Sequence, residues 1–231
     1  MIKLFLATLL ICTASVRYLP EVKVAGALSN IMMDGDLSAH INLDTLNKTH
    51  LYGLGPVAGL KGEVVVIDGK IYSTYKEGSK LVSQQNKISL AAMLVYSKVE
   101  KWKEISVPSA VKNYAELENL VKQTAQKDGY DIKKPFAFKI KSSPSKTAWH
   151  VIDWKSKIVH TMENHKQFAY SGTFANEPVL LLGFYSTHHK SIFTHHTSNM
   201  HVHVLEKKSG TAGHLDDIQI DGTVTIYLPV E

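Results

Sequence analysis

The spacing of apolar and polar residues predicts turns, strands and helices along most of this chain. A β-branched run at residues 63–67 and a second apolar run at residues 71–75 flank the dipeptide Asp68-Gly69. An Asp-Gly pair between two such runs is typical of a tight β-hairpin, so a hairpin is predicted here. Before it, residues 44–51 are expected to form a short helix that ends at Gly53.

The pattern is most clearly helical between residues 113 and 127. Apolar residues recur there at intervals of three and four, at Leu117, Leu120, Val121 and Ala125, which gives a helix with one apolar face. Asn113 can cap the first turn, Glu116 stands three residues later, and Gly129 follows the last turn. These signals predict both ends of the helix.

From residue 135 onward the apolar runs are short and separated by turn residues, which is typical of strands. Strands are expected at 136–140, 148–152, 179–185, 201–205, 215–220 and 223–228. The chain is therefore expected to have an α+β (α/β) fold. We expect a mixed α/β part with a mixed sheet at residues 25–134. It packs on a β-rich part at residues 135–231, which forms a small barrel or a sandwich.

The N-terminus has the pattern of a secretory signal peptide. Lys3 precedes an apolar run from Leu4 to Ile11, and small residues follow at 13–15. The run is too short to span a bilayer as a helix. We therefore expect residues 1–15 to direct export to the periplasm or the exterior, leaving no stable membrane span after their removal; a buried first strand or helix is the alternative. Cys12 follows Ile11 rather than a small residue, so lipoprotein anchoring is not expected.

Composition and charge exclude several classes of protein. With 231 residues, of which 44% are apolar, the chain can bury a sizeable core, which excludes intrinsic disorder. The net charge is +5 and the basic residues are scattered, whereas nucleic acid requires a clustered basic surface, so no nucleic-acid partner is expected. Arg17 is the only arginine. The folded part therefore has no guanidinium with which to bind a carboxylate in bidentate fashion.

A cluster of histidines gives the sharpest chemical signal. His201 and His203 are two residues apart on a predicted strand, so their imidazoles project from the same face. His214 begins the next predicted strand after a glycine-containing turn, and it can add a third imidazole. Three protein ligands leave a position open for water or substrate, as in catalytic metal sites. Neutral imidazoles suit zinc, although another divalent transition metal is possible.

Four more histidines precede this strand, and their roles are open. They can be additional ligands, groups that support the ligands, or solvated residues, and a loop position is favoured for all of them: His188, His189, His195 and His196. A surface pair is the alternative interpretation of His201 and His203 alone. The third histidine makes metal binding the preferred interpretation.

Two blocks of the sequence resemble the alpha-acetolactate decarboxylase family. The first block includes Gly53-Leu54-Gly55, Leu60-Lys61-Gly62-Glu63 and Asp68-Gly69-Lys70-Ile71-Tyr72. The second block includes Gly183-Phe184, His201-x-His203 and Gly213-His214-x-x-Asp217. The two blocks occur in the family's order and cover most of the chain from residue 27 to 220, so the resemblance is fairly specific.

The resemblance implies a metal-dependent lyase that converts 2-acetolactate to acetoin and carbon dioxide. It implies a mixed α/β part followed by a β-barrel, with zinc on three histidines that match His201, His203 and His214. Glu63 matches a glutamate of the family and is expected to handle the proton. The family's active-site arginine has no counterpart in residues 146–151, where His150, or in second place Lys146, would substitute for it.

Three functional hypotheses remain from the sequence. The first is an exported acetolactate decarboxylase, and the second keeps the fold and the metal but acts on another 2-hydroxy-3-keto acid. The third is a non-catalytic relative that binds a metal or ligand. In each case the partner is a small molecule, and the family resemblance favours a homodimer.

Overall fold

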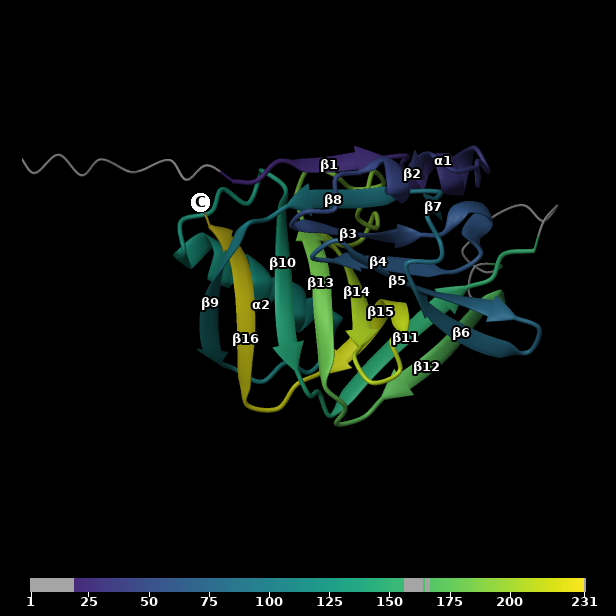
Figure 1. Cartoon of the computed structure of the whole chain (residues 1–231). Helices are drawn as coiled ribbons and strands as arrows, with labels where there is room; N and C mark the ends of the chain where they lie inside the picture. Colours follow the sequence, from purple (N-terminus) through teal and green to yellow (C-terminus); the bar gives the residue numbers. More distant parts are fainter. Residues whose placement is uncertain (1–18, 156–163, 165–166, 231) are drawn as a thin grey trace, which may run out of the picture.

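Two antiparallel β-sheets form most of the fold (Figure 1). The structure is a computed structural model that describes residues 19–155, 164 and 167–230. The first sheet has the strand order β1-β8-β3-β4-β5-β6, in which the strands span Val22–Ala25, Leu94–Lys98, Leu51–Pro56, Glu63–Ile67, Lys70–Glu77 and Lys80–Gln85. The second has the order β12-β11-β15-β14-β13-β10-β16-β9, with strands at Ala169–Phe174, Lys146–Ile152, Ala212–Gln219, Met200–Glu206, Val179–Tyr185, Phe136–Ser142, Thr223–Val230 and Lys101–Pro108.

Short strands, two helices and two 3-10 turns complete the fold. Strands β2 (Ile41–Asn42) and β7 (Leu90–Ala91) form a small separate pair. Helix α1 spans Leu28–Met33, and helix α2 spans Tyr114–Lys127. Two 3-10 turns, η1 and η2, cover Leu43–Thr45 and Ala58–Leu60.

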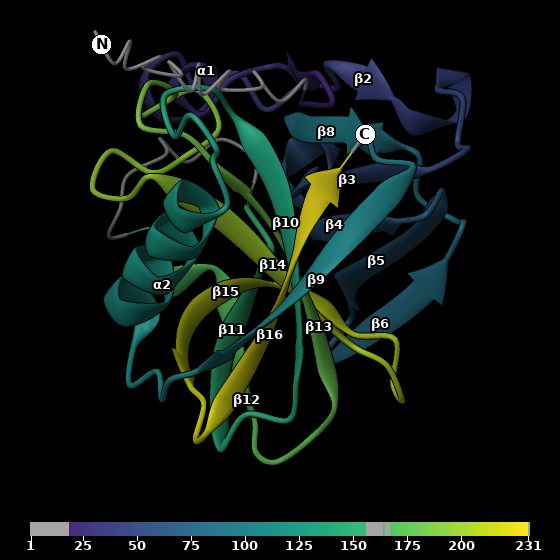
Figure 2. The ribbon, with the colours of Figure 1, turned by 90° about the vertical axis from the view of Figure 1, so that its left-hand side faces the viewer.

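Each face of the second sheet buries a different hydrophobic cluster. One face packs on the first sheet, where Leu54 and Val65 share a buried cluster with Leu182 and Phe184. The other face is covered by α2, whose buried residues Leu117, Leu120, Val121 and Ala125 join a cluster with Val202 and Leu215 (Figure 2). Because side chains alternate along a strand, residues next to Val202 point toward the first sheet.

Helix α2 confirms the predicted helix and its caps. The side chain of Asn113 accepts a hydrogen bond from the Glu116 N–H at 2.9 Å, and Gly129 has a positive φ of 84° after the last turn. Asp217 of β15 also accepts a hydrogen bond from the Tyr114 N–H at 3.1 Å. The carboxylate of Asp217 therefore holds the start of α2 against the second sheet. It also places a negative charge at the helix N-terminus, where such a charge is stabilising.

The α+β class is confirmed, and the sheets differ from the expectation in two details. The described strands of the first sheet pair antiparallel throughout rather than as a mixed sheet. Short connections, such as the turn between β4 and β5, permit only antiparallel neighbours, because a parallel pair needs a long crossover. The second sheet is open rather than a closed barrel over the described residues, with β12 and β9 at its ends.

The second sheet contains a strand that lies before the predicted boundary at residue 134. Strand β9 precedes residue 134, yet it pairs with β16 from Thr223↔Pro108 to Val230↔Lys101. Helix α2 likewise packs on the second sheet. The expected parts at residues 25–134 and 135–231 therefore do not correspond to the two sheets one by one.

The local predictions before residue 80 have mixed outcomes. The hairpin is confirmed as β4 and β5, with positive φ at both Asp68 and Gly69. The helix predicted at 44–51 is wrong, because only the 3-10 turn at Leu43–Thr45 forms and β3 begins at Leu51. Polar side chains stabilise turns in this segment instead: Asn42 accepts a hydrogen bond from the Asp44 N–H, and Asn47 accepts one from the Thr49 N–H.

The expected signal peptide, residues 1–15 with Cys12, lies outside the described residues. Among the residues that are described, no helix has the length and apolar character needed to cross a membrane.

Candidate metal centre

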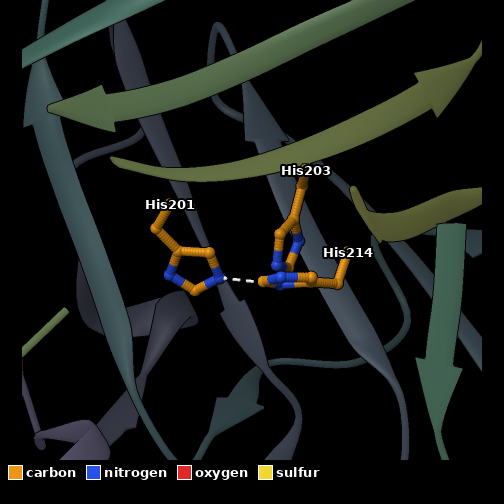
Figure 3. Close-up of side chains that lie close together, drawn as sticks. All are labelled: His201, His203 and His214. Atoms are coloured by element: carbon orange, nitrogen blue, oxygen red, sulfur yellow. Dashed lines mark hydrogen bonds between the residues drawn. The ribbon is translucent and has the colours of Figure 1, made fainter. Parts of the chain in front are cut away.

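The three predicted ligands come together on the face of the second sheet that meets the first sheet (Figure 3). His201 and His203 alternate along β14 with Val202, which points to the opposite face. His214 on β15 stands directly opposite His203 in the strand register. One potential ligand atom from each histidine lies within 4.8 Å of the other two. The sequence prediction of a three-histidine cluster is therefore confirmed in its geometry.

Burial keeps the imidazoles of His201 and His203 neutral. Burial lowers the pKa of His201 to about 4 and the pKa of His203 well below its ordinary value. The Nδ1 atom of His203 lies 3.0 Å from the carbonyl oxygen of Val64, on β4 of the first sheet. A neutral His203 donates its Nδ1 proton to that oxygen, which leaves Nε2 as a lone-pair donor.

The donor set fits a divalent transition metal. His203 Nε2 is buried and makes no hydrogen bond to any described residue. His201 Nε2 lies 3.1 Å from His214 Nδ1, near the separation of about 3.3 Å expected for two imidazole nitrogens on one tetrahedral zinc ion. Neutral, unprotonated nitrogen atoms facing a common point are what such an ion requires. The cluster could therefore hold a metal ion on three protein ligands.

Glu63 joins the cluster from the other sheet. It begins β4, and its Oε2 atom lies 3.5 Å from His203 Nε2. The preceding Gly62 has φ +143°, and a β-carbon there would lie 2.5 Å from the carbonyl oxygen of Thr74, so only glycine fits this approach to Glu63. Burial raises the pKa of Glu63 to about 7, although the charge of His150 and a backbone hydrogen bond from Ile152 oppose this shift.

His150 lies beside the cluster on β11, opposite His214 in the strand register. The His150 and His214 ring centroids are 4.8 Å apart. His150 Nδ1 lies 2.7 Å from Asp216 Oδ1. Burial opposes a charge on His150, but the hydrogen bond and the negative charge of Asp216 outweigh it and raise the pKa of His150 above its ordinary value. The pair therefore favours a protonated imidazole next to the three histidines.

One cavity of about 930 Å³ opens onto these groups. Glu63, His150, His201 and His214 line it, together with Asp216. Sequence reasoning missed Asp216, although the signal was present: it follows His214 by two residues on a strand, so the two side chains project from the same face. Lys146, the second substitute considered for the arginine, is not among the residues that line the cavity, and its Nζ atom lies 3.7 Å from Asp217.

The four histidines that precede His201 in the predicted loop, His188, His189, His195 and His196, lie in the segment between β13 and β14, which confirms the expected loop position. None of them belongs to the three-histidine cluster found among the described residues. His195 and His196 line the cavity, with ring centroids 4.1 Å apart. His188 and His189 instead contact hydroxyl groups of their own loop, those of Thr187 and Ser186.

The sequence matches the family model described as Alpha-acetolactate decarboxylase over residues 25–230. The chain belongs to the alpha-acetolactate decarboxylase family. This match covers the whole second sheet, the first sheet from the last residue of β1 onward, and all three histidines of the cluster. Among curated proteins, none matches the sequence.

Solved structures of this family share the fold. Alpha-acetolactate decarboxylase from Bacillus subtilis strain 168 is 16% identical and superposes with a TM-score of 0.74, covering 90% of this chain and 86% of that one. The acetolactate decarboxylase of Bacillus subtilis subspecies spizizenii gives 17% identity, a TM-score of 0.74 and the same coverage. A Staphylococcus aureus protein of unknown function, similar to alpha-acetolactate decarboxylase, gives 15% identity and a TM-score of 0.73 over 91% and 86% of the two chains.

Proposed function

We propose that this chain is a metal-dependent carboxy-lyase that converts 2-acetolactate to acetoin and carbon dioxide. The observation that carries the proposal is the position of Glu63. Its carboxyl group reaches the three-histidine cluster from the opposite sheet, 3.5 Å from His203 Nε2, in the cavity that also contains His150. Membership of a family of carboxy-lyases supports the same reaction.

His201, His203 and His214 would hold the metal, for which we propose zinc or another divalent transition metal. When bound, such an ion supplies Lewis acidity toward the adjacent keto and hydroxyl oxygens of the substrate. The setting is largely buried, because His201 and His203 are only 5% and 0% exposed. Charges act more strongly at such a site than in water.

Glu63 is proposed to handle the proton. Loss of carbon dioxide from a 2-hydroxy-3-keto acid leaves an electron pair that must accept a proton at carbon, and the hydroxyl proton must also be managed. The Glu63 carboxyl is a general acid–base group on the wall of the same cavity.

His150 is proposed to take the place of the missing guanidinium. When protonated, its imidazole, held by Asp216, would present one N–H donor and a positive charge toward the cavity. A single donor orients a carboxylate less firmly than the planar fork of arginine. Because the carboxylate leaves as carbon dioxide during the reaction, the chemistry does not require strong binding of this group.

The test is turnover of racemic 2-acetolactate by metal-loaded protein purified without a histidine tag. We expect acetoin and carbon dioxide in equal amounts, formed faster than the spontaneous reaction and abolished by a chelator. If another 2-hydroxy-3-keto acid were decarboxylated while acetolactate was not, the second hypothesis would replace the first. One bound metal per chain with no turnover of any such acid would favour the non-catalytic relative.

Two predictions from the sequence concern other properties of the protein. Export through residues 1–15 and assembly into a homodimer stay predictions.

A further inference from the structure

The cavity is larger than the proposed substrate requires. Cavities of roughly 300–1,000 Å³ hold drug-sized ligands, and this one measures about 930 Å³. Acetolactate is a five-carbon acid, and the polar groups that would bind it occupy one part of the lining. The rest of the cavity wall is therefore available to another part of a ligand.

Part of the remaining wall is apolar, and five of its residues belong to one hydrophobic cluster or pack against it. Ile31, Leu60 and Ile152 are buried members of that cluster, and Leu28 and Ala169 pack against it. All five also line the cavity. They come from α1, η2, β11 and β12, so four elements contribute apolar side chains to this part of the lining.

The apolar wall begins beside the proposed reacting groups. Ile152 follows His150 by two residues on β11, and the two side chains therefore project from the same face. The Ile152 backbone also hydrogen-bonds to the Glu63 carboxyl. A chain attached to the reacting carbon would reach this wall without leaving the cavity.

The far end of the wall is held in place but remains exposed. The Leu28 and Ser29 N–H groups donate hydrogen bonds of 2.8 Å to the carbonyl oxygens of Ile192 and Ser191, which fixes α1 against the histidine-containing loop. Met32 and Met33 of α1 also line the cavity, and Met33 is 82% exposed. Methionine side chains adapt to ligands of different shape, so an apolar ligand would cover surface that is otherwise in contact with water.

We propose that the preferred substrate is a 2-hydroxy-3-keto acid whose substituent is a longer apolar chain than the methyl groups of acetolactate, and that this chain lies along Leu28 and Ala169, which cover the buried Ile31, Leu60 and Ile152. The proposal rests on the proposed function and specifies the substrate of the same site. Transfer of each added methylene from water to this wall contributes about 0.8 kcal/mol, equivalent to about fourfold in affinity.

The experiment measures binding as well as turnover on the metal-loaded full chain. Calorimetry is carried out with 2-hydroxy-2-methyl acids that lack the keto group, with the second substituent lengthened from methyl to butyl. Such acids cannot undergo the decarboxylation, so the affinity is measured alone. We expect the dissociation constant to fall about fourfold with each methylene, and the matching keto acids to show a rising kcat/KM.

Variants of the wall locate the apolar chain. Ala169→Leu fills the wall and should lower the butyl-to-methyl affinity ratio by about tenfold or more, since the added side chain occupies the space of several methylenes. Leu28→Ala, which removes apolar surface without adding bulk, should lower the same ratio less. Ala110→Leu makes the matched change at an exposed residue outside the cavity and should leave the ratio unchanged.

The outcomes separate this inference from the proposed function. An affinity that is flat or falls with chain length, with acetolactate turned over normally, overturns the inference and leaves the function in place. A rising affinity that neither Ala169→Leu nor Leu28→Ala changes overturns the assigned wall. Absence of turnover for acetolactate and all its homologues overturns the proposed function, whatever the affinities are.

Discussion

Asp216 Oδ1 lies 2.7 Å from His150 Nδ1, across the register of neighbouring strands β15 and β11. The pair lines the cavity next to His214, and Nδ1 is the ring nitrogen of His150 that faces the carboxylate. In a chain whose only arginine is Arg17, it places an imidazole paired with a carboxylate beside the three-histidine cluster.

Asp216→Asn should weaken substrate binding more than it slows the chemical step. The amide keeps the size of the side chain but removes the negative charge that supports a protonated His150. Hydrogen bonds to charged groups contribute about 1.5–3 kcal/mol, so KM should rise by roughly tenfold or more with a smaller change in kcat. Steady-state kinetics with acetolactate measures both values.

Asp217→Asn is the matched control for this prediction. Asp217 is the next residue, but its carboxylate accepts a hydrogen bond from the Tyr114 N–H at the start of α2. Its substitution should lower the melting temperature and leave KM nearly unchanged. Equal effects of the two variants on KM would remove the assigned role of Asp216.

Glu63→Gln should lower turnover by at least ~100-fold, the lower end of general acid–base contributions. Glutamine retains the shape of the side chain, so the three histidines should still bind one metal ion per chain. Turnover and metal content are therefore measured on the same preparation. A variant as fast as the wild type would show that another group handles the proton.

His201→Ala and His203→Ala should each abolish stoichiometric metal binding. His188→Ala and His189→Ala should leave it largely intact, because these side chains contact hydroxyl groups of their own loop. Elemental analysis after dialysis gives the metal content of all four variants. Retention of metal by both variants of the first pair would place the site elsewhere in the chain.

Lys139 should make stability depend on pH in alkaline solution. Burial, followed by the charge of Lys141, lowers the pKa of Lys139 to about 8, while the unfolded chain retains a pKa of about 10.4. Between these values the unfolded state binds more protons than the folded state, so the free energy of unfolding should increase as pH rises. Below pH 8 both states are protonated and the cost of the buried charge is fully present.

Comparison with Lys139→Met isolates this effect. Lys139 Nζ lies 3.9 Å from the centroid of the Trp102 ring, and the substitution also removes this contact. The resulting loss of stability does not vary with pH below pH 8. Urea denaturation should show the wild type gaining stability relative to the variant from pH 8 to about pH 10. A difference that stays constant over this range would contradict the assignment.

Much of the site could be predicted because its signals are local. The alternation His201-Val202-His203 fixes two imidazoles on one face of any strand, and a turn brings His214 opposite His203. The role of Glu63 was accessible only through the family resemblance, since its 3.5 Å approach to His203 joins two sheets. The residues around Glu63 in the sequence do not indicate that it lies close to His203.

The remaining differences have the same physical origin. Strand β9 pairs with β16 more than 100 residues away in the sequence, and nothing in its own residues identifies that partner. The helix predicted at 44–51 failed because Asn42 and Asn47 hydrogen-bond to nearby backbone N–H groups and stabilise turns. Pairing between distant strands depends on packing that a short stretch of sequence does not encode.

The hydrogen bond from His203 to the Val64 carbonyl joins a metal ligand of one sheet to the backbone of the other. Because Glu63 of the first sheet also faces this histidine, an ion bound to the three histidines of the second sheet would lie at the contact between the two sheets. Mass action then couples metal binding to the docking of the sheets, and free metal at 100 times its dissociation constant would stabilise the docked sheets by about 2.7 kcal/mol. Substitutions that weaken the packing of the two sheets at positions far from the histidines would therefore reduce metal affinity. Removal of the metal would likewise lower the stability of core regions that contain no metal ligand.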